Sequence, residues 1–156
     1  MIMNSTELAY RKTAVEGASG FGLLIALYDT LAGDLLRAAD AERINDIEKR
    51  CQEINHATLV VGYLEDWIER SGGGELAQQL TAFYSSLRRK MIEAQVKRSA
   101  EILEEQVALV LRIRETWSAM EKQNSSAMEA TRVTQVPGYP GAMQTVQHGT
   151  ACSWSA

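Results

Sequence analysis

Four consecutive segments of this chain repeat apolar side chains at spacings of three and four residues, and short connections separate them. That spacing places the apolar positions on one face of an α-helix, whereas a β-strand would show alternation. Short connections between helices of similar length make neighbouring helices antiparallel. The pattern therefore predicts an all-α protein, an antiparallel up-down four-helix bundle over residues 19–122.

Capping residues indicate where these helices begin and end. Asn45 followed by Glu48 has the pattern of a capping box at the start of the second helix. Residues 72–74 are all glycine, which suits the left-handed turn that ends a helix, so the third helix is expected to start at Glu75. Ser99 is expected to cap the fourth helix.

The two ends of the chain lack this periodicity. Residues 1–18 are mixed in character and are predicted to form either a helix or an N-terminal arm that lies on the bundle. Residues 123–156 are rich in Ser, Thr, Gln, Ala and Gly and hold both prolines, which predicts a disordered tail. The sequence shows neither a secretory signal nor an apolar run of about 20 residues, so a cytoplasmic protein without membrane insertion is expected.

Charge and cysteine content narrow the class of protein further. The net charge is −4, whereas nucleic-acid-binding proteins usually show a basic excess, so no nucleic-acid partner is predicted. The two cysteines, Cys51 and Cys152, fall on a predicted buried stripe and in the tail, so a structural disulfide is not expected.

The second predicted helix carries more apolar side chains than one buried face needs. A stripe at helical spacing comprises Ile47, Cys51, Ile54, Val61, Leu64 and Ile68. A second set falls off this stripe and comprises Leu59, Val60, Tyr63 and Trp67. The second set either completes a tight core between four helices or forms a binding surface for an apolar partner.

The sequence offers no set of residues for catalysis or metal binding. Glu53 and His56 have the spacing of a di-iron ligand pair, but such a site needs two of these motifs, and the other histidine, His148, lies in the tail. No serine–histidine–acid triad can be assembled around the single histidine of the predicted helices. We therefore expect no cofactor and no enzymatic activity.

The densest basic cluster runs from Arg88 to Lys90 in the third helix. The two arginines either form a solvated helix face, bind acidic groups of a partner, or pair with Glu93 and Glu101.

Several short stretches, in order and at matching spacing, resemble one protein family. They comprise Ala9-Tyr10, Val15-Glu16, Ala18-Ser19, Leu27-Tyr28-Asp29, the run from Gly73 to Ala77, Leu80, Tyr84, Arg88-Arg89, Glu93-Ala94 and Trp117. The chain resembles the flagellar secretion chaperones of the FliS type over about residues 9–120.

The resemblance implies a cytosolic export chaperone. Its client would be the disordered C-terminal region of flagellin, which it keeps from polymerising early and helps to deliver to the flagellar type III export apparatus. The family holds its client in grooves of the bundle, and its N-terminal segment covers part of the groove. Tyr10 matches the tyrosine of that segment, so residues 1–18 are expected to compete with flagellin.

Helical faces together with the resemblance give the predicted partner-binding residues. They are Tyr10, Leu59, Tyr63, Trp67, Tyr84, Leu87 and Arg88. The alternative function is an adaptor or regulatory bundle that binds a helix of another protein.

Overall fold

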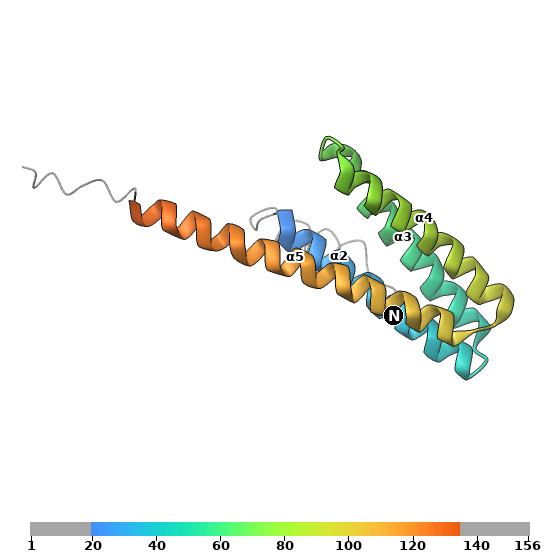
Figure 1. Cartoon of the computed structure of the whole chain (residues 1–156). Coiled ribbons are helices and arrows are strands. Elements are labelled where there is room, and N and C mark those ends of the chain that lie inside the picture. The colour runs from blue at the N-terminus through green and yellow to red at the C-terminus, as the bar shows by residue number, and fades with distance from the viewer. Residues whose placement is uncertain (1–19, 135–156) are drawn as a thin grey trace, which may run out of the picture. The chain divides into compact units, whose positions relative to one another are not determined.

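The computed structural model describes residues 20–134 and shows four helices (Figure 1). They are α2 (Gly20–Arg43), α3 (Ile47–Arg70), α4 (Glu75–Lys97) and α5 (Ala100–Thr134). The described residues contain no β-strand. The predicted all-α, four-helix architecture is confirmed, while the predicted arm over residues 1–18 lies outside the described residues.

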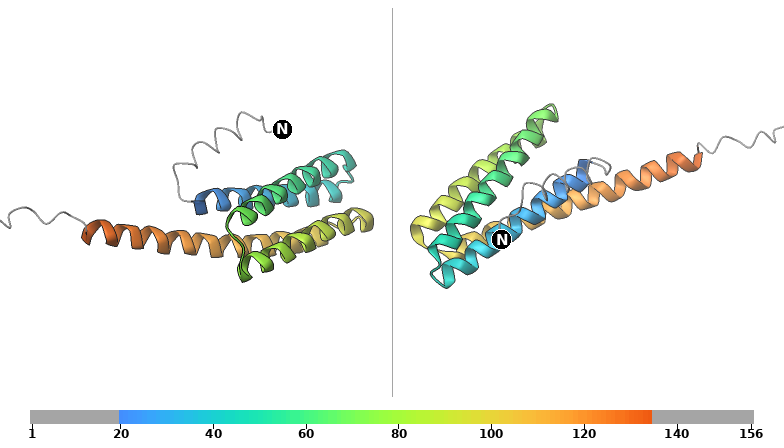
Figure 2. Two further views of the ribbon diagram at one scale, coloured as in Figure 1. Left: turned by 90° about the horizontal axis from the view of Figure 1, so that it is seen from above. Right: turned by 180° about the vertical axis from the view of Figure 1, so that it is seen from behind.

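The chain divides into two units after Glu121, so the bundle holds α5 only from Ala100 to that residue. Figure 2 shows α3 beside α2 in its left view and α4 beside α3 in its right view, and these two helix pairs are in contact. Each helix is antiparallel to the next, as an up-down bundle requires. None of the described helices has an apolar stretch long enough to cross a lipid bilayer.

The core follows the predicted apolar stripes. Its fully buried large side chains include Leu31 and Leu35 from α2, Val61 and Leu64 from α3, Leu87 and Met91 from α4, and Leu103 and Val110 from α5. Each helix therefore contributes one apolar face to a single core, which is the main stabilising term of such a bundle.

The predicted caps are confirmed at two of three connections. Gly72, Gly73 and Gly74 have φ of 91°, 82° and 113°, the left-handed region that glycine adopts without strain. Ser99 Oγ accepts a hydrogen bond from the Ile102 amide at 3.4 Å. The capping box at Asn45 was wrong.

Asp46, rather than Asn45, caps α3. Its Oδ1 accepts a hydrogen bond from the Lys49 amide at 3.0 Å. Asn45 takes φ of 59°, and asparagine tolerates this left-handed conformation better than most residues. Its side chain accepts a hydrogen bond from Arg98, so it ties the α2–α3 turn to the end of α4.

The predicted disorder of the tail was also wrong for its first twelve residues. Residues 123–134 continue α5 as a helix instead of being disordered. The segment lacks apolar periodicity, but six of its twelve residues are Ala, Met, Glu, Gln or Arg, which have good intrinsic helix propensity. Every side chain described from Lys122 to Val133 is exposed, so this helix is not part of the core. Residues 135–156 lie outside the described residues.

The observed burial of two α3 residues differs from the prediction. Val60 was placed off the buried stripe, yet it is buried in the core, because α3 packs against both α2 and α4 and so buries a wider face than one stripe. Ile47 was placed on the stripe but is half exposed, since it lies in the first turn of the helix beyond the packed region. Cys51 is only partly buried and is a free thiol.

Candidate functional site

The helix pairs α2/α5 and α3/α4 diverge toward the turn between α3 and α4 (Figure 1). A cleft opens between α4 and α5 at this diverging end, with a volume of about 240 Å³. Small-molecule sites usually occupy about 300–1,000 Å³, so this cleft suits one or two side chains of a partner rather than a metabolite.

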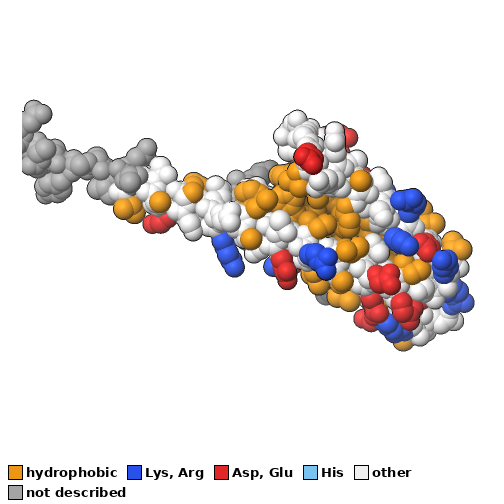
Figure 3. Space-filling model, in the orientation of Figure 1, with side chains coloured by type: hydrophobic (Ala, Val, Ile, Leu, Met, Phe, Trp, Pro, Cys, Tyr) orange, Lys and Arg blue, Asp and Glu red, His pale blue; other side chains and the backbone are white. Residues whose placement is uncertain are grey.

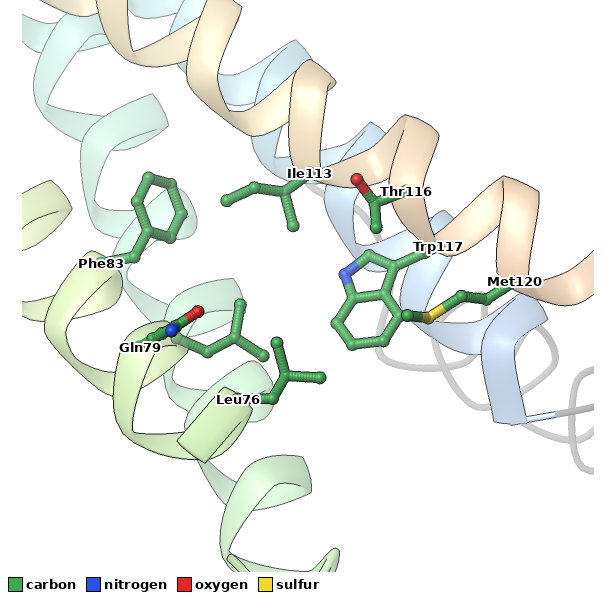
Figure 4. A pocket seen from close by; sticks show the side chains of 8 residues that line it. Leu76, Gln79, Phe83, Ile113, Thr116, Trp117 and Met120 are labelled. Atoms are coloured by element: carbon green, nitrogen blue, oxygen red, sulfur yellow. The ribbon is translucent and has the colours of Figure 1, made fainter. Parts of the chain in front are cut away.

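The walls of the cleft are mainly apolar (Figure 4). Helix α4 contributes Leu76, Gln79, Leu80 and Phe83, and α5 contributes Ile113, Thr116, Trp117 and Met120. In the space-filling view, apolar side chains form a continuous surface over this region, while charged side chains gather toward the opposite end of the bundle (Figure 3). A surface of this kind favours association with an apolar partner.

Trp117 forms the floor of the cleft and is itself 4% exposed. Its ring centroid lies 6.1 Å from that of Phe21, 6.5 Å from that of Tyr28 and 6.0 Å from that of Trp67. These separations are typical of favourable aromatic pairs. The cluster therefore joins α2, α3 and α5 where the helix pairs diverge, and it supports the floor of the cleft.

A buried polar pair lies next to this aromatic cluster. The hydroxyls of Tyr28 and Tyr84 are hydrogen-bonded at 2.5 Å and join α2 to α4 across the core. Burial raises the pKa of both phenols, and the hydrogen bond only partly offsets this for Tyr28. The Trp117 indole lies near the Tyr28 hydroxyl, but its buried Nε1 has no hydrogen-bond partner among residues 20–134.

The predicted partner-binding residues do not form one surface. Leu59 and Tyr63 are exposed on α3, at 64% and 55%. Tyr84 and Leu87 are fully buried, so their side chains face the core of the bundle rather than a partner. Tyr10 lies outside the described residues.

The two remaining predicted residues form contacts within the bundle. Trp67 is partly buried, and its ring lies edge-on to that of Trp117. It therefore packs against a residue that lines the cleft but does not line the cleft itself. Arg88 forms a bidentate interaction with Glu65, with nitrogen–oxygen distances of 3.2 and 2.7 Å. Neither Glu93 nor Glu101 is its partner, because Glu93 binds Lys90 and Lys97 instead.

Sequence reasoning missed the cleft itself. The apolar repeats of α4 and α5 include Leu76, Ile113 and Met120, and their helical spacing predicts that they lie on the inward faces of these helices. Leu76 is nevertheless 50% exposed because the two helices separate at that level. Hydrophobic periodicity reports which face of a helix is apolar but carries no signal about where two packed helices diverge.

The residues with di-iron spacing on α3 have other partners. Glu53 pairs with Arg37 at 3.0 Å, and His56 Nδ1 lies 2.6 Å from Asp34 Oδ2. Burial raises the pKa of Asp34, against the opposing effects of His56 and Arg37. Within residues 20–134, no group of three or more histidine, cysteine or acidic side chains is placed so that it could hold a metal ion. This polar set connects α2 to α3.

Comparisons with known proteins agree with this architecture. The family model described as "Flagellar protein FliS" matches residues 3–124. The chain is also 25% identical over 115 residues to the "Flagellar secretion chaperone FliS" of Salmonella typhimurium strain LT2, which covers 73% of this chain and 85% of that protein. The family match spans the whole bundle, including both walls of the cleft, and the chain therefore belongs to the FliS family of flagellar proteins.

Proposed function

We propose that this protein is a cytoplasmic, non-catalytic chaperone of flagellar secretion that binds the C-terminal region of flagellin. Binding would keep that region from polymerising before export and would allow its transfer to the flagellar export apparatus. Family membership and the printed name of the Salmonella relative support the general function. The apolar cleft between α4 and α5 is the observation that supports a role in binding a chain.

The chemistry of the cleft suits an amphipathic segment that folds as it binds. Its exposed apolar walls would accept successive apolar side chains of a helix, which is the helix-in-groove mode of recognition. Gln79 and Thr116 lie at the cleft and can exchange hydrogen bonds with polar groups at the edge of the client. An unfolded client must be ordered on binding, so affinity is expected to be moderate for the area buried.

Isothermal titration of the full chain with a peptide of the organism's own flagellin C-terminus tests this proposal. We expect saturable binding near one to one, with a strongly negative heat-capacity change from burial of apolar surface. Leu76→Ser and Met120→Ser, both at exposed cleft positions, should each weaken binding by about tenfold.

Ile44→Ser is the matched control, because Ile44 is 74% exposed in the turn between α2 and α3, at the other end of the bundle. It should bind as tightly as the parent protein. Absence of binding at high micromolar concentration would reject flagellin as the client and would favour an adaptor or regulatory bundle.

A further inference from the structure

A second apolar surface lies on α3 and α4, away from the cleft. Ile92 and Val96 on α4 are 61% and 78% exposed, and Leu59 and Tyr63 on α3 are 64% and 55% exposed. Each pair is separated by four residues, so its members adjoin on one face of their helix. Large apolar side chains grouped in this way mark interaction surfaces more often than isolated ones do.

Two contacts fix how α3 and α4 align along this surface. The Cys51 thiol lies 3.8 Å from the Gln95 side-chain oxygen. Closer to the turn between α3 and α4, Arg88 binds Glu65. The Arg88 side chain also lies over Gly62, since a Cβ added to this glycine would be 4.0 Å from Arg88 Nη2. Because the helices are antiparallel, Leu59 and Ile92 lie at the same level between these two contacts. The exposed pairs of α3 and α4 therefore form one surface.

The outer face, as we call it, comprises Leu59, Tyr63, Arg88, Arg89, Ile92 and Val96. It is distinct from the cleft. Ile92 follows the cleft residue Phe83 by nine positions, which is about two and a half turns of helix, so the two side chains point to opposite sides of α4. A partner on the outer face therefore does not occupy the cleft.

The charge of this region differs in sign from that of the whole chain. From Arg88 to Arg98, five side chains are basic and one, Glu93, is acidic, although the net charge of the chain is −4. Glu93 is already bound by Lys90 and Lys97, which lower its pKa to about 2. Arg89 is exposed and forms no ion pair with any described residue.

We propose that the outer face binds an amphipathic helix whose polar side carries acidic residues. The apolar side of that helix would contact Leu59, Ile92 and Val96. Its carboxylates would pair mainly with Arg89. They would also contact Arg88, which already binds Glu65 within the bundle. A second copy of this chain fits less well, because a two-fold pair would place the same basic surfaces opposite each other.

Designed peptides test this proposal with the full chain. One labelled peptide of about 18 residues, long enough for five helical turns, carries leucines along one face and glutamates beside them. A matched peptide has lysine in place of every glutamate. Fluorescence anisotropy should show saturable binding of the acidic peptide, at least about tenfold tighter than that of the basic peptide, and weaker at high salt.

Variants then locate the binding site. Arg89→Glu and Ile92→Ser should each weaken binding of the acidic peptide by about tenfold, and both positions are exposed, so the fold is retained. The cleft variant Leu76→Ser should leave it unchanged, and protein saturated with flagellin peptide should still bind it. Equal binding of the two peptides, or loss of binding in Leu76→Ser alone, would overturn the proposal. Neither result depends on whether flagellin binds the cleft.

Discussion

At the scale of single residues, the Tyr28–Tyr84 hydrogen bond is the polar contact that most specifies this core. Both side chains are at most 1% exposed, and they join helices that are not neighbours in sequence. A buried polar group that loses its partner carries the full cost of its desolvation, whereas loss of both partners can be nearly neutral.

Single and double phenylalanine variants of this pair should therefore be non-additive. Tyr84→Phe should lower the free energy of unfolding by about 1–3 kcal/mol, because it leaves the Tyr28 hydroxyl without its partner. Tyr28→Phe/Tyr84→Phe should lose less than the sum of the two single variants. Urea denaturation of all four proteins measures this coupling, and strict additivity would show that the hydroxyls do not interact.

The same two phenols predict how stability depends on pH. Burial raises both pKa values above the usual value of about 10, so the folded protein keeps protons that the unfolded chain releases. Their contribution is complete below about pH 10 and is lost as the pH rises above it. Urea midpoints on either side of pH 10 should fall more in the parent protein than in the double phenylalanine variant, and equal falls would contradict this.

Trp67 and Tyr63 were predicted together as partner-binding residues, but they should respond differently to truncation. Trp67→Ala removes an edge-on contact with Trp117 and should lower stability by at least about 2 kcal/mol. Tyr63 is 55% exposed, so Tyr63→Ala should change stability by no more than about 0.5 kcal/mol. Thermal denaturation distinguishes the two, and a similar small loss in both variants would place Trp67 outside the aromatic cluster.

At the scale of helices, most of the architecture follows from the sequence. The stripes of α2, α4 and α5 predicted which faces are buried, because a helix in a bundle must bury its apolar side. The glycines after α3 predicted its end, because they adopt positive φ. Asn45 and Asp46 are adjacent and both suit an N-cap, so sequence preference did not identify the cap.

The C-terminal part of α5 was harder to predict, since no packing determines its structure. Removing residues 123–156 should change the free energy of unfolding by no more than about 0.5 kcal/mol, because the side chains described from Lys122 onward are exposed. Leu103→Ala, in the core part of the same helix, should lower it by about 2–5 kcal/mol. A large loss on truncation, seen by urea denaturation, would mean that the removed segment stabilises the bundle.

At the scale of the whole bundle, the cleft arises from the way the helix pairs separate (Figures 1 and 4). The sequence indicated a surplus of apolar side chains on α3, namely Leu59, Val60, Tyr63 and Trp67, but of these four only Leu59 and Tyr63 are exposed. Divergence of two helix pairs depends on side chains from all four helices, among them the bulky cluster around Trp117. Single-helix periodicity does not contain that information.

Site-specific photo-crosslinking tests the proposal that the C-terminal region of flagellin binds in the cleft between α4 and α5. A photoreactive residue replaces Gln79 or Thr116, which are both exposed at the cleft, or Asp40, which is exposed on α2. With the flagellin C-terminal peptide bound, Gln79 and Thr116 should crosslink efficiently and Asp40 only weakly. A stable complex that crosslinks at Asp40 but at neither cleft position would show that flagellin does not bind in the cleft.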